Sequence, residues 1–329
     1  MPVFFNGRLI VSPATASYIN DSALQPQSTS VGNVVALVGR STGGKPKTVL
    51  RYGSPQEAAL DLVSGELLDA VNAAFHPSPE TGGPDTVVVV RVNPAVQSTG
   101  AIKDSGGNTL MTLTSVNYGL RENQIQYRVE AGSVSGFRVT TRRGQDYYTK
   151  DNIERRAFSI RYTGAQASAT MTVTNSTLTL HAPAGTVVAA IDLTLYPTIV
   201  SLVDRINATD GFTGTVLDTS FNAPSLNGLD YVTNQDVKTS EYVTKGDLQA
   251  VIDWLNGPTQ SFVKAERALN VGTLPAVTPW TFLAGGSDGT TTFTDWSDAF
   301  TALQAVDVQW ITPVSGAPAI HALADTHAT

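Results

Sequence analysis

The 329-residue sequence contains no cysteine. Its absence excludes a disulfide framework, a zinc site with Cys ligands, an iron–sulfur cluster and a cysteine nucleophile. Charged residues are also few, at 15% of the chain against roughly 25% in an average soluble domain. The formal net charge of -7 and a pI near 5.1 argue against a general nucleic-acid coat, which carries a basic surface.

Long apolar runs and targeting signals are missing as well. The first eight residues have no basic region and no apolar stretch of the kind found in signal peptides. The most apolar run, Val87–Val90, is far shorter than a membrane span. We therefore predict a protein that is made in a cytoplasm and does not insert into a membrane.

Residues 1–30 predict an extended N-terminal arm. They contain Pro2, Pro13 and Pro26, only two charged residues and no helical periodicity. An extended apolar segment needs a surface to lie on, either in its own chain or in a neighbour. The residues that we expect to make this contact are apolar: Val3, Phe4, Phe5, Leu9, Ile10 and Val11. Plain disorder is the alternative interpretation.

Residues 31–94 predict a strand–helix–strand unit with parallel strands. The run Val34–Val38 is continuously apolar, which is typical of a buried strand. A helix begins after the capping residue Ser54 and continues on one apolar side to Phe75. The apolar segment Thr86–Val92 supplies the second strand.

Residues 95–243 predict a β-rich module, most simply a barrel or a sandwich with one helix. The helix is expected near residues 198–207, with Ile199, Leu202, Val203 and Ile206 on its apolar face. The expected strands alternate apolar and polar residues: Thr109–Val116, Gln124–Glu130, Gly136–Arg142, Ala157–Thr163, Ala169–Thr174, Thr177–His181 and Val187–Leu195.

The α/β pattern returns at residue 244. Helices are predicted after Gly246 and from Thr294, and an apolar strand over Val308–Ile311. The predicted fold class is therefore α+β or α/β. One discontinuous α/β core domain, made from residues 31–94 and 244–329, carries an inserted β-rich domain over residues 95–243.

One glycine-rich loop invites a nucleotide-binding interpretation. The segment Gly39–Pro46 has the spacing G-x-x-x-x-G-K of a phosphate-binding loop. Pro46 stands where that loop needs a hydroxyl side chain, and the next helix starts eight residues too late, at Ser54. We therefore interpret the segment as a connecting loop and predict no bound cofactor.

No other motif predicts a catalytic or metal site. The four histidines are scattered, and His321 and His327 lie six residues apart rather than the four that place two ligands on one helix face. Asp288 lies between glycines in the loop Leu283–Gly289, where a turn-forming role is favoured over a ligand role. The sequence predicts no catalytic residue and no metal site.

Charge is distributed unevenly along the chain. Residues 121–161 hold nine Lys and Arg against five Asp and Glu, whereas residues 162–329 hold five against fifteen. Ordinary solvated surface explains this pattern, and so do complementary faces on a self-associating subunit. Nucleic-acid binding by the basic stretch is a weaker alternative.

Several segments, taken in order, resemble the tail sheath proteins of contractile phages. The strand Asn33–Gly39 and the helix start Ser54–Ala58 look like the beginning of the sheath core. The segment Tyr118–Ile125 is similar to the start of the family's inserted β domain. The loop Leu283–Gly289 and the strand Val308–Ile311 look like a later segment of the core.

This resemblance implies a structural protein of the virion rather than an enzyme. Sheath subunits stack as hexameric rings around a tail tube, and their contraction drives the tube through the host envelope to deliver the genome. The implied partners are other copies of the chain, the tail tube protein, and the baseplate and tail terminator proteins. Assembly is expected in the host bacterial cytoplasm, and the arm over residues 1–30 would add strands to sheets of neighbouring subunits.

Sheath proteins usually continue past the point where this sequence stops. The resemblance therefore implies further core elements and a C-terminal arm that these residues do not include. Two alternatives stay open: a sheath subunit of a related contractile machine, such as a type VI secretion system or a phage-tail-like bacteriocin, and an α/β nucleotide-binding enzyme.

Overall fold

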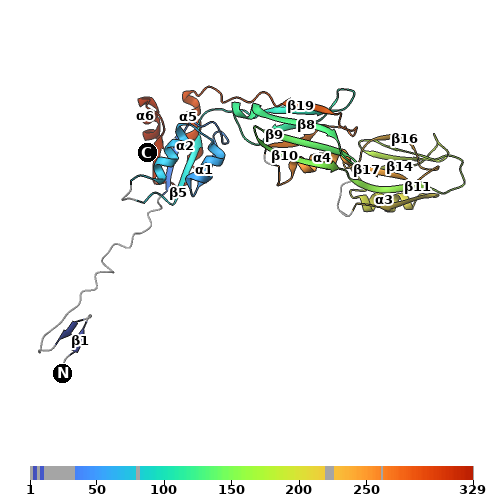
Figure 1. The fold of residues 1–329 in the computed structure, drawn as a ribbon, viewed down its shortest axis with the longest axis horizontal. Coiled ribbons are helices and arrows are strands. Elements are labelled where there is room, and N and C mark those ends of the chain that lie inside the picture. The colour runs from blue at the N-terminus through green and yellow to red at the C-terminus, as the bar shows by residue number, and fades with distance from the viewer. Residues whose placement is uncertain are drawn as a thin grey trace.

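The computed structural model describes residues 34–78, 82–218, 226–260 and 262–328. It also pairs two short N-terminal strands, β1 (Val3–Phe5) and β2 (Arg8–Ile10), antiparallel to each other. The fold is mixed α/β, with mostly sheets and few helices. Its sheets form three groups in a row along the long axis of the molecule, and we call these the α/β unit, the middle unit and the distal unit (Figure 1).

The α/β unit contains a four-stranded sheet in the order β20-β3-β5-β4. Its strands are β3 (Val34–Gly39), β4 (Val49–Tyr52), β5 (Thr86–Arg91) and β20 (Trp310–Pro313). Strands β3 and β5 run parallel, as the sequence predicts. Strand β20 also runs parallel to β3, and β4 runs antiparallel to β5.

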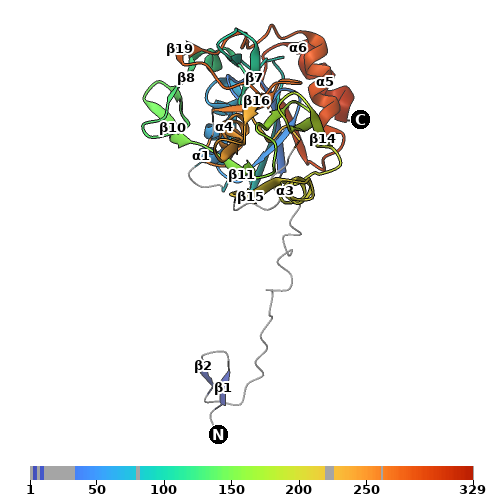
Figure 2. The ribbon, with the colours of Figure 1, turned by 90° about the vertical axis from the view of Figure 1, so that its right-hand side faces the viewer.

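Helices cover both faces of this sheet. The helices are α1 (Pro55–Leu62), α2 (Glu66–Phe75), α5 (Phe293–Leu303) and α6 (Pro318–Ala328). Val87 and Val89 of β5 pack with α1 and α2, while Val88 and Val90 pack with α5 and α6. Figure 2 shows α1 on one side of the molecule and α5 and α6 on the other. Because both faces are buried, β5 is apolar without alternation.

The single helix predicted from Ser54 to Phe75 is wrong: the structure divides it into α1 and α2. The chain turns at Val63 and Gly65, which both have positive φ angles, of 65° and 109°. The break frees the carbonyl oxygens of Leu62 and Ser64 from helical hydrogen bonding. They accept the amides of Gly43 and Thr42 instead, and so tie the glycine-rich loop to the helix pair.

The middle unit contains two antiparallel sheets and helix α4 (Asp247–Asn256) around one core. The first sheet has the order β10-β9-β8-β19: β8 (Ile125–Ala131), β9 (Phe137–Arg143), β10 (Asp146–Ile153) and β19 (Thr278–Phe282). The second has the order β18-β7-β6: β6 (Thr99–Lys103), β7 (Thr109–Ser115) and β18 (Val263–Arg267). A short 3-10 helix over Leu120–Gln124 leads into β8.

The distal unit has a separate core between two further antiparallel sheets. One sheet has the order β15-β11-β17: β11 (Arg156–Tyr162), β15 (Phe212–Val216) and β17 (Tyr242–Lys245). The other has the order β14-β13-β12-β16: β12 (Thr170–Val173), β13 (Thr177–His181), β14 (Val187–Asp192) and β16 (Val232–Asp236). Helix α3 (Ile199–Asn207) begins after Thr198 and buries the four apolar residues that the sequence predicts.

Strand pairing places the α/β unit's second segment later in the chain than residue 244. Strands β18 and β19 pair with β7 and β8 of the middle unit, and α4 packs in the same core. Residues 95–243 likewise supply two cores rather than one. We therefore propose an insertion that runs from about residue 95 to Leu283 and comprises the middle and distal units. Within the described ranges, no helix is long and apolar enough to cross a membrane.

Candidate functional site at the joint between two units

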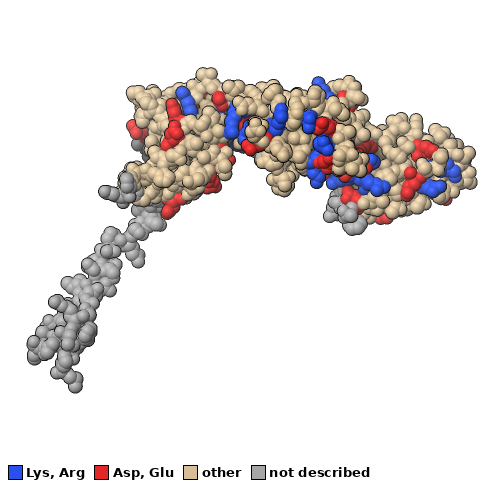
Figure 3. Space-filling model, viewed as in Figure 1, with Lys and Arg blue, Asp and Glu red and all other residues tan. Residues whose placement is uncertain are grey.

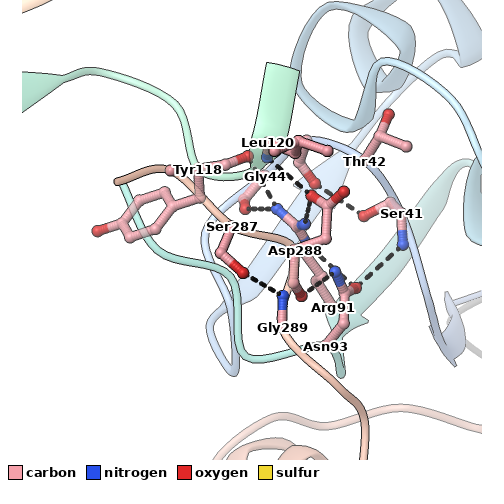
Figure 4. Close-up of polar contacts among 12 residues, drawn as sticks. Ser41, Thr42, Gly44, Arg91, Asn93, Tyr118, Leu120, Ser287, Asp288 and Gly289 are labelled. Atoms are coloured by element: carbon pink, nitrogen blue, oxygen red, sulfur yellow. Dashed lines mark hydrogen bonds and ion pairs between the residues drawn. The ribbon is translucent and has the colours of Figure 1, made fainter. Parts of the chain in front are cut away.

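Arg91, the last residue of β5, lies fully buried at the joint between the α/β and middle units. Its Nε donates a hydrogen bond to Asn93 Oδ1 at 3.0 Å, and its Nη1 donates to the carbonyl oxygens of Gly44 at 2.8 Å and Tyr118 at 3.2 Å. Its Nη2 lies 3.3 Å from Asp288 Oδ1 (Figure 4). One side chain therefore holds four segments of the chain together.

The two chain crossings between these units meet at Asp288. Its Oδ1 also accepts the amide of Leu120 at 3.2 Å, in the segment between β7 and β8 of the middle unit. Its carbonyl oxygen accepts Asn93 Nδ2 at 3.0 Å. Farther into the middle unit, Asn123 donates to the carbonyl oxygen of Gly286 and accepts its amide, at 2.9 and 2.8 Å. The returning crossing is thus bonded to other segments both at Gly286 and at Asp288, so Asp288 does more than form a turn.

The buried charge makes this joint sensitive to the loss of any one partner. Burial lowers the pKa of the Arg91 guanidinium, and the nearby Asp288 carboxylate opposes that shift. A buried guanidinium is costly unless hydrogen-bond acceptors surround it, and removal of one partner commonly costs several kcal/mol. Here the acceptors come from three sequence-distant segments, so the charge favours the conformation in which these segments converge.

Gly119 lets the chain pass close to Asp288 and Thr42 at this joint. Its φ of +123° is a conformation that L residues rarely adopt, and a Cβ there would lie 2.5 Å from Asp288 Oδ1 and 2.8 Å from the carbonyl oxygen of Thr42. Only glycine fits such a position without displacement of backbone.

We expect Gly119→Ala to destabilise the chain by about 2–3 kcal/mol, since it adds both backbone strain and a steric clash. Gly107→Ala is the matched control, because Gly107 also has a positive φ, of +86°, but its Cβ would meet nothing within 4 Å. Thermal unfolding of the two variants separates the cost of the positive φ angle, which both variants share, from the cost of the steric clash, which only Gly119→Ala has. Equal losses of stability would show that contact with Asp288 and Thr42 is unimportant.

The glycine-rich loop over Gly39–Pro46 uses its amides within the protein. The amide of Ser41 donates to Asn93 Oδ1, and those of Thr42 and Gly43 donate to the carbonyl oxygens of Ser64 and Leu62 at the end of α1. A phosphate cradle needs such amides to point together at a ligand, ahead of a helix N-terminus. Helix α1 instead begins only at Pro55. The loop geometry supports its interpretation as a connecting loop.

A second polar cluster lies where the middle unit meets the distal unit. Helix α4 follows Gly246, which offers no side-chain cap. The carboxylate of Asp230, which is distant in sequence, caps the start of the helix instead. Asp230 accepts the amides of Asp247 and Leu248 at 2.8 and 3.1 Å, while Asp247 Oδ1 accepts the amide of Arg155 at 2.9 Å. Burial raises the pKa of both carboxyls, that of Asp247 to about 6.

The histidines form no common site. His76 ends α2, His181 belongs to β13, and His321 Nε2 lies 2.7 Å from the carbonyl oxygen of Ser315. Across the described ranges, no group of three or more His, Asp and Glu side chains is placed to hold a metal ion. The side chains of the predicted arm residues (Val3, Phe4, Phe5, Leu9, Ile10 and Val11) lie outside the described residues.

Sequence reasoning missed Arg91 although a signal was present. Arg91 ends a run of four valines in a strand that is buried on both faces, where a charged side chain is costly unless it is paired. The sequence did mark three of the segments that Arg91 joins: Gly39–Pro46, Tyr118–Ile125 and Leu283–Gly289. Their convergence on one side chain is a property of the topology.

Comparison with known proteins supports the resemblance inferred from the sequence. No protein-family model matches the chain. It is 32% identical to the tail sheath protein of Bacillus phage SP01 over 99% of this chain, and 29% identical to a putative tail sheath protein of Enterococcus phage phiEF24C over 96%. A shorter match, 28% identical over 51% of the chain, is to the tail sheath protein of Staphylococcus phage Twort. The resemblance to phage tail sheath proteins is thereby confirmed.

The chain spans 57% of the length of the first two relatives. Among solved structures, it is similar to sheath tail proteins from Listeria innocua and Desulfitobacterium hafniense, at 12% and 14% identity. The TM-scores are 0.43 and 0.45. These matches cover 89% and 90% of this chain, and 43% and 45% of the solved chains.

Proposed function

We propose that this chain, which is similar to phage tail sheath proteins along nearly its whole length, is a structural subunit of a contractile tail sheath. Copies stack as hexameric rings around a tail tube, and the sleeve shortens to drive the tube through the host envelope. The observation that carries the proposal is the 32% identity to a tail sheath protein over 99% of the chain.

The joint around Arg91 supports a mechanical role. A subunit that moves as a rigid body in a contracting polymer must transmit force from one unit to the next. Arg91 and Asp288 bond segments of both units across two chain crossings, and Arg91 has no exposed surface. The polar groups that a catalytic site would hold free for a substrate are here engaged in joining backbone segments.

The N-terminal segment is proposed as the connection between subunits. Val3, Phe4, Phe5, Leu9, Ile10 and Val11 would add strands to the sheet of a neighbouring copy, with main-chain hydrogen bonds supplying the affinity. The proposed partners beyond the chain itself are the tail tube, baseplate and tail terminator proteins. The proposed location is the virion tail, after assembly in the host cytoplasm.

Electron microscopy of the full-length gene product, expressed without other tail proteins, tests the proposal. Hollow sleeves or stacked rings of uniform diameter are the expected result. A product that stays strictly monomeric at high concentration, in sedimentation as well as in images, would count against a sheath subunit.

We expect deletion of residues 1–11 to abolish sleeve formation without unfolding the subunit. The buried residues of the described cores begin at Ala36, so the deletion removes none of them. Replacement of residues 12–22 by a Gly/Ser linker of equal length is the matched control and should preserve sleeves. Sleeves of normal length from the deletion variant, seen by microscopy, would exclude the arm as the connection.

A further inference from the structure

A groove of about 570 Å³ runs over the middle unit on the face of the β10-β9-β8-β19 sheet that points away from α4. Trp280 of β19 is one of the residues that line it. The guanidinium of Arg142 lies 3.9 Å from the Trp280 ring centroid, and that of Arg128 lies 4.7 Å from it. Tyr147, with 65% of its surface exposed, lines the same groove. The groove contains part of the basic stretch that the sequence singles out.

The groove carries one basic side chain without an acidic partner. Arg128 pairs with Glu130, and Arg138 pairs with Asp151. Arg142 donates only Nε, to the neutral Gln126 Oε1 at 2.7 Å, and among the described residues no carboxylate forms an ion pair with it. An Arg guanidinium stacked on Trp, with a free pair of Nη groups, is suited to bind a carboxylate. Trp, Tyr and Arg are also the side chains that dominate protein interfaces.

The opposite side of the molecule has the complementary chemistry. Residues 292–329 contain four Asp and neither Lys nor Arg, and they include both α5 and α6. Asp298 on α5 has a side chain that is 48% exposed, and it shares Lys47 with Asp295, so that two carboxylates face one cation there. Asp325 on α6 is exposed as well. Phe293, at the start of α5, has 55% of its surface exposed, which gives the acidic face an apolar contact of its own.

We propose that the groove around Arg142 and Trp280 receives the α5–α6 face of a second copy of this chain. The proposal rests on the sheath function. Figure 2 shows β8 and β10 on the side of the molecule opposite to α5 and α6, and Figure 3 shows many Lys and Arg, interspersed with Asp and Glu, over the middle of the molecule. Complementary surfaces on opposite sides produce a heterologous contact, which repeats from copy to copy and builds an open polymer.

Disulfide cross-linking tests this contact on a clean background, because the full chain has no cysteine of its own. Tyr147→Cys places a thiol in the groove, and Ala322→Cys places one on the exposed side of α6. The double variant, oxidised at high concentration, is expected to form a ladder of cross-linked oligomers. A mixture of the two single variants is expected to form the mixed dimer.

Leu60→Cys provides the matched control. Leu60 is 79% exposed on α1, away from the α5–α6 face. The Tyr147→Cys, Leu60→Cys pair is expected to cross-link about tenfold less than the proposed pair. A higher yield from this control pair would mean that copies meet groove to α1, and the proposal would be overturned.

Charge reversal separates electrostatic recognition from simple proximity. Arg142→Glu should lower the cross-linked fraction about tenfold, and Asp325→Arg in the partner copy should restore part of it. No loss with Arg142→Glu would overturn the proposal. The proposal would also be overturned if the chain binds dextran sulfate through Arg142 while the Tyr147→Cys and Ala322→Cys variants form no cross-link. The groove would then bind an anionic polymer.

The outcomes distinguish this inference from the proposed function. If Arg142→Glu forms normal sleeves, the proposed groove contact is wrong, whereas the proposed sheath function is unaffected. A wild-type chain that forms no sleeves, together with cysteine variants that cross-link through no pair, would contradict both.

Discussion

Replacement of Arg91 by methionine is expected to lower the free energy of unfolding of the chain by about 3–4 kcal/mol. Methionine keeps most of the buried volume but donates no hydrogen bond. The carbonyl oxygens of Gly44 and Tyr118 would lose their donor, and Asn93 and Asp288 would lose one of theirs. Each buried group without a partner costs about 1–3 kcal/mol. The first calorimetric transition should fall by roughly 6–12 °C.

Arg51→Met is the control for this experiment. Arg51 belongs to β4 of the same sheet and is paired in register with Val88, but its side chain is exposed. The control should change stability by less than about 0.5 kcal/mol. If the two variants unfold at the same temperature, Arg91 does not hold the joint, and the rigidity that we assign to it has another source.

Asp247→Asn is expected to stabilise the chain at pH 7.5 and to have little effect at pH 4. Burial raises the pKa of the Asp247 carboxyl to about 6; a hydrogen bond from the backbone amide of Arg155 opposes the shift, and the charge of Asp230 adds to it. A raised carboxyl pKa means that the folded state favours the neutral form. The stability from this group is therefore fully present below about pH 4 and is lost as the pH rises through 6.

Asparagine keeps the oxygen that accepts the Arg155 amide and removes the charge. The expected gain at pH 7.5 is about 2–3 kcal/mol, because each unit of pKa shift corresponds to about 1.4 kcal/mol. Unfolding of both proteins in urea from pH 4 to 8 measures the difference. Glu266→Gln, at an exposed position on β18, should show no such pH-dependent difference. A gain from Asp247→Asn that is equal at pH 4 and 7.5 would refute the assignment.

Local patterns predicted many elements of this fold. The run Val34–Val38 and the segment Thr86–Val92 are apolar without alternation, and they form the paired parallel strands β3 and β5. The capping residue Thr198 and the apolar face that follows it gave the start and buried side of α3. In both cases the signal comes from residues close in sequence, so periodicity and capping suffice.

The sequence did not predict what depends on distant residues. Strand β10 contains mostly exposed polar residues and lacks the alternation of a half-buried strand, so it was not recognised. Gly246 offers no cap to α4, and the cap comes from Asp230, 17 residues earlier. The joint around Arg91 depends on Asp288, 197 residues away. Such contacts leave no trace in local composition.

The arrangement of the three cores in a row has a geometric consequence. Among the described residues, the distal unit follows the middle unit at the end of the row farthest from the α/β unit, so that a pivot at the α/β unit would make it the free end of a lever (Figure 1). A small tilt at the pivot sweeps the far tip through a much larger arc.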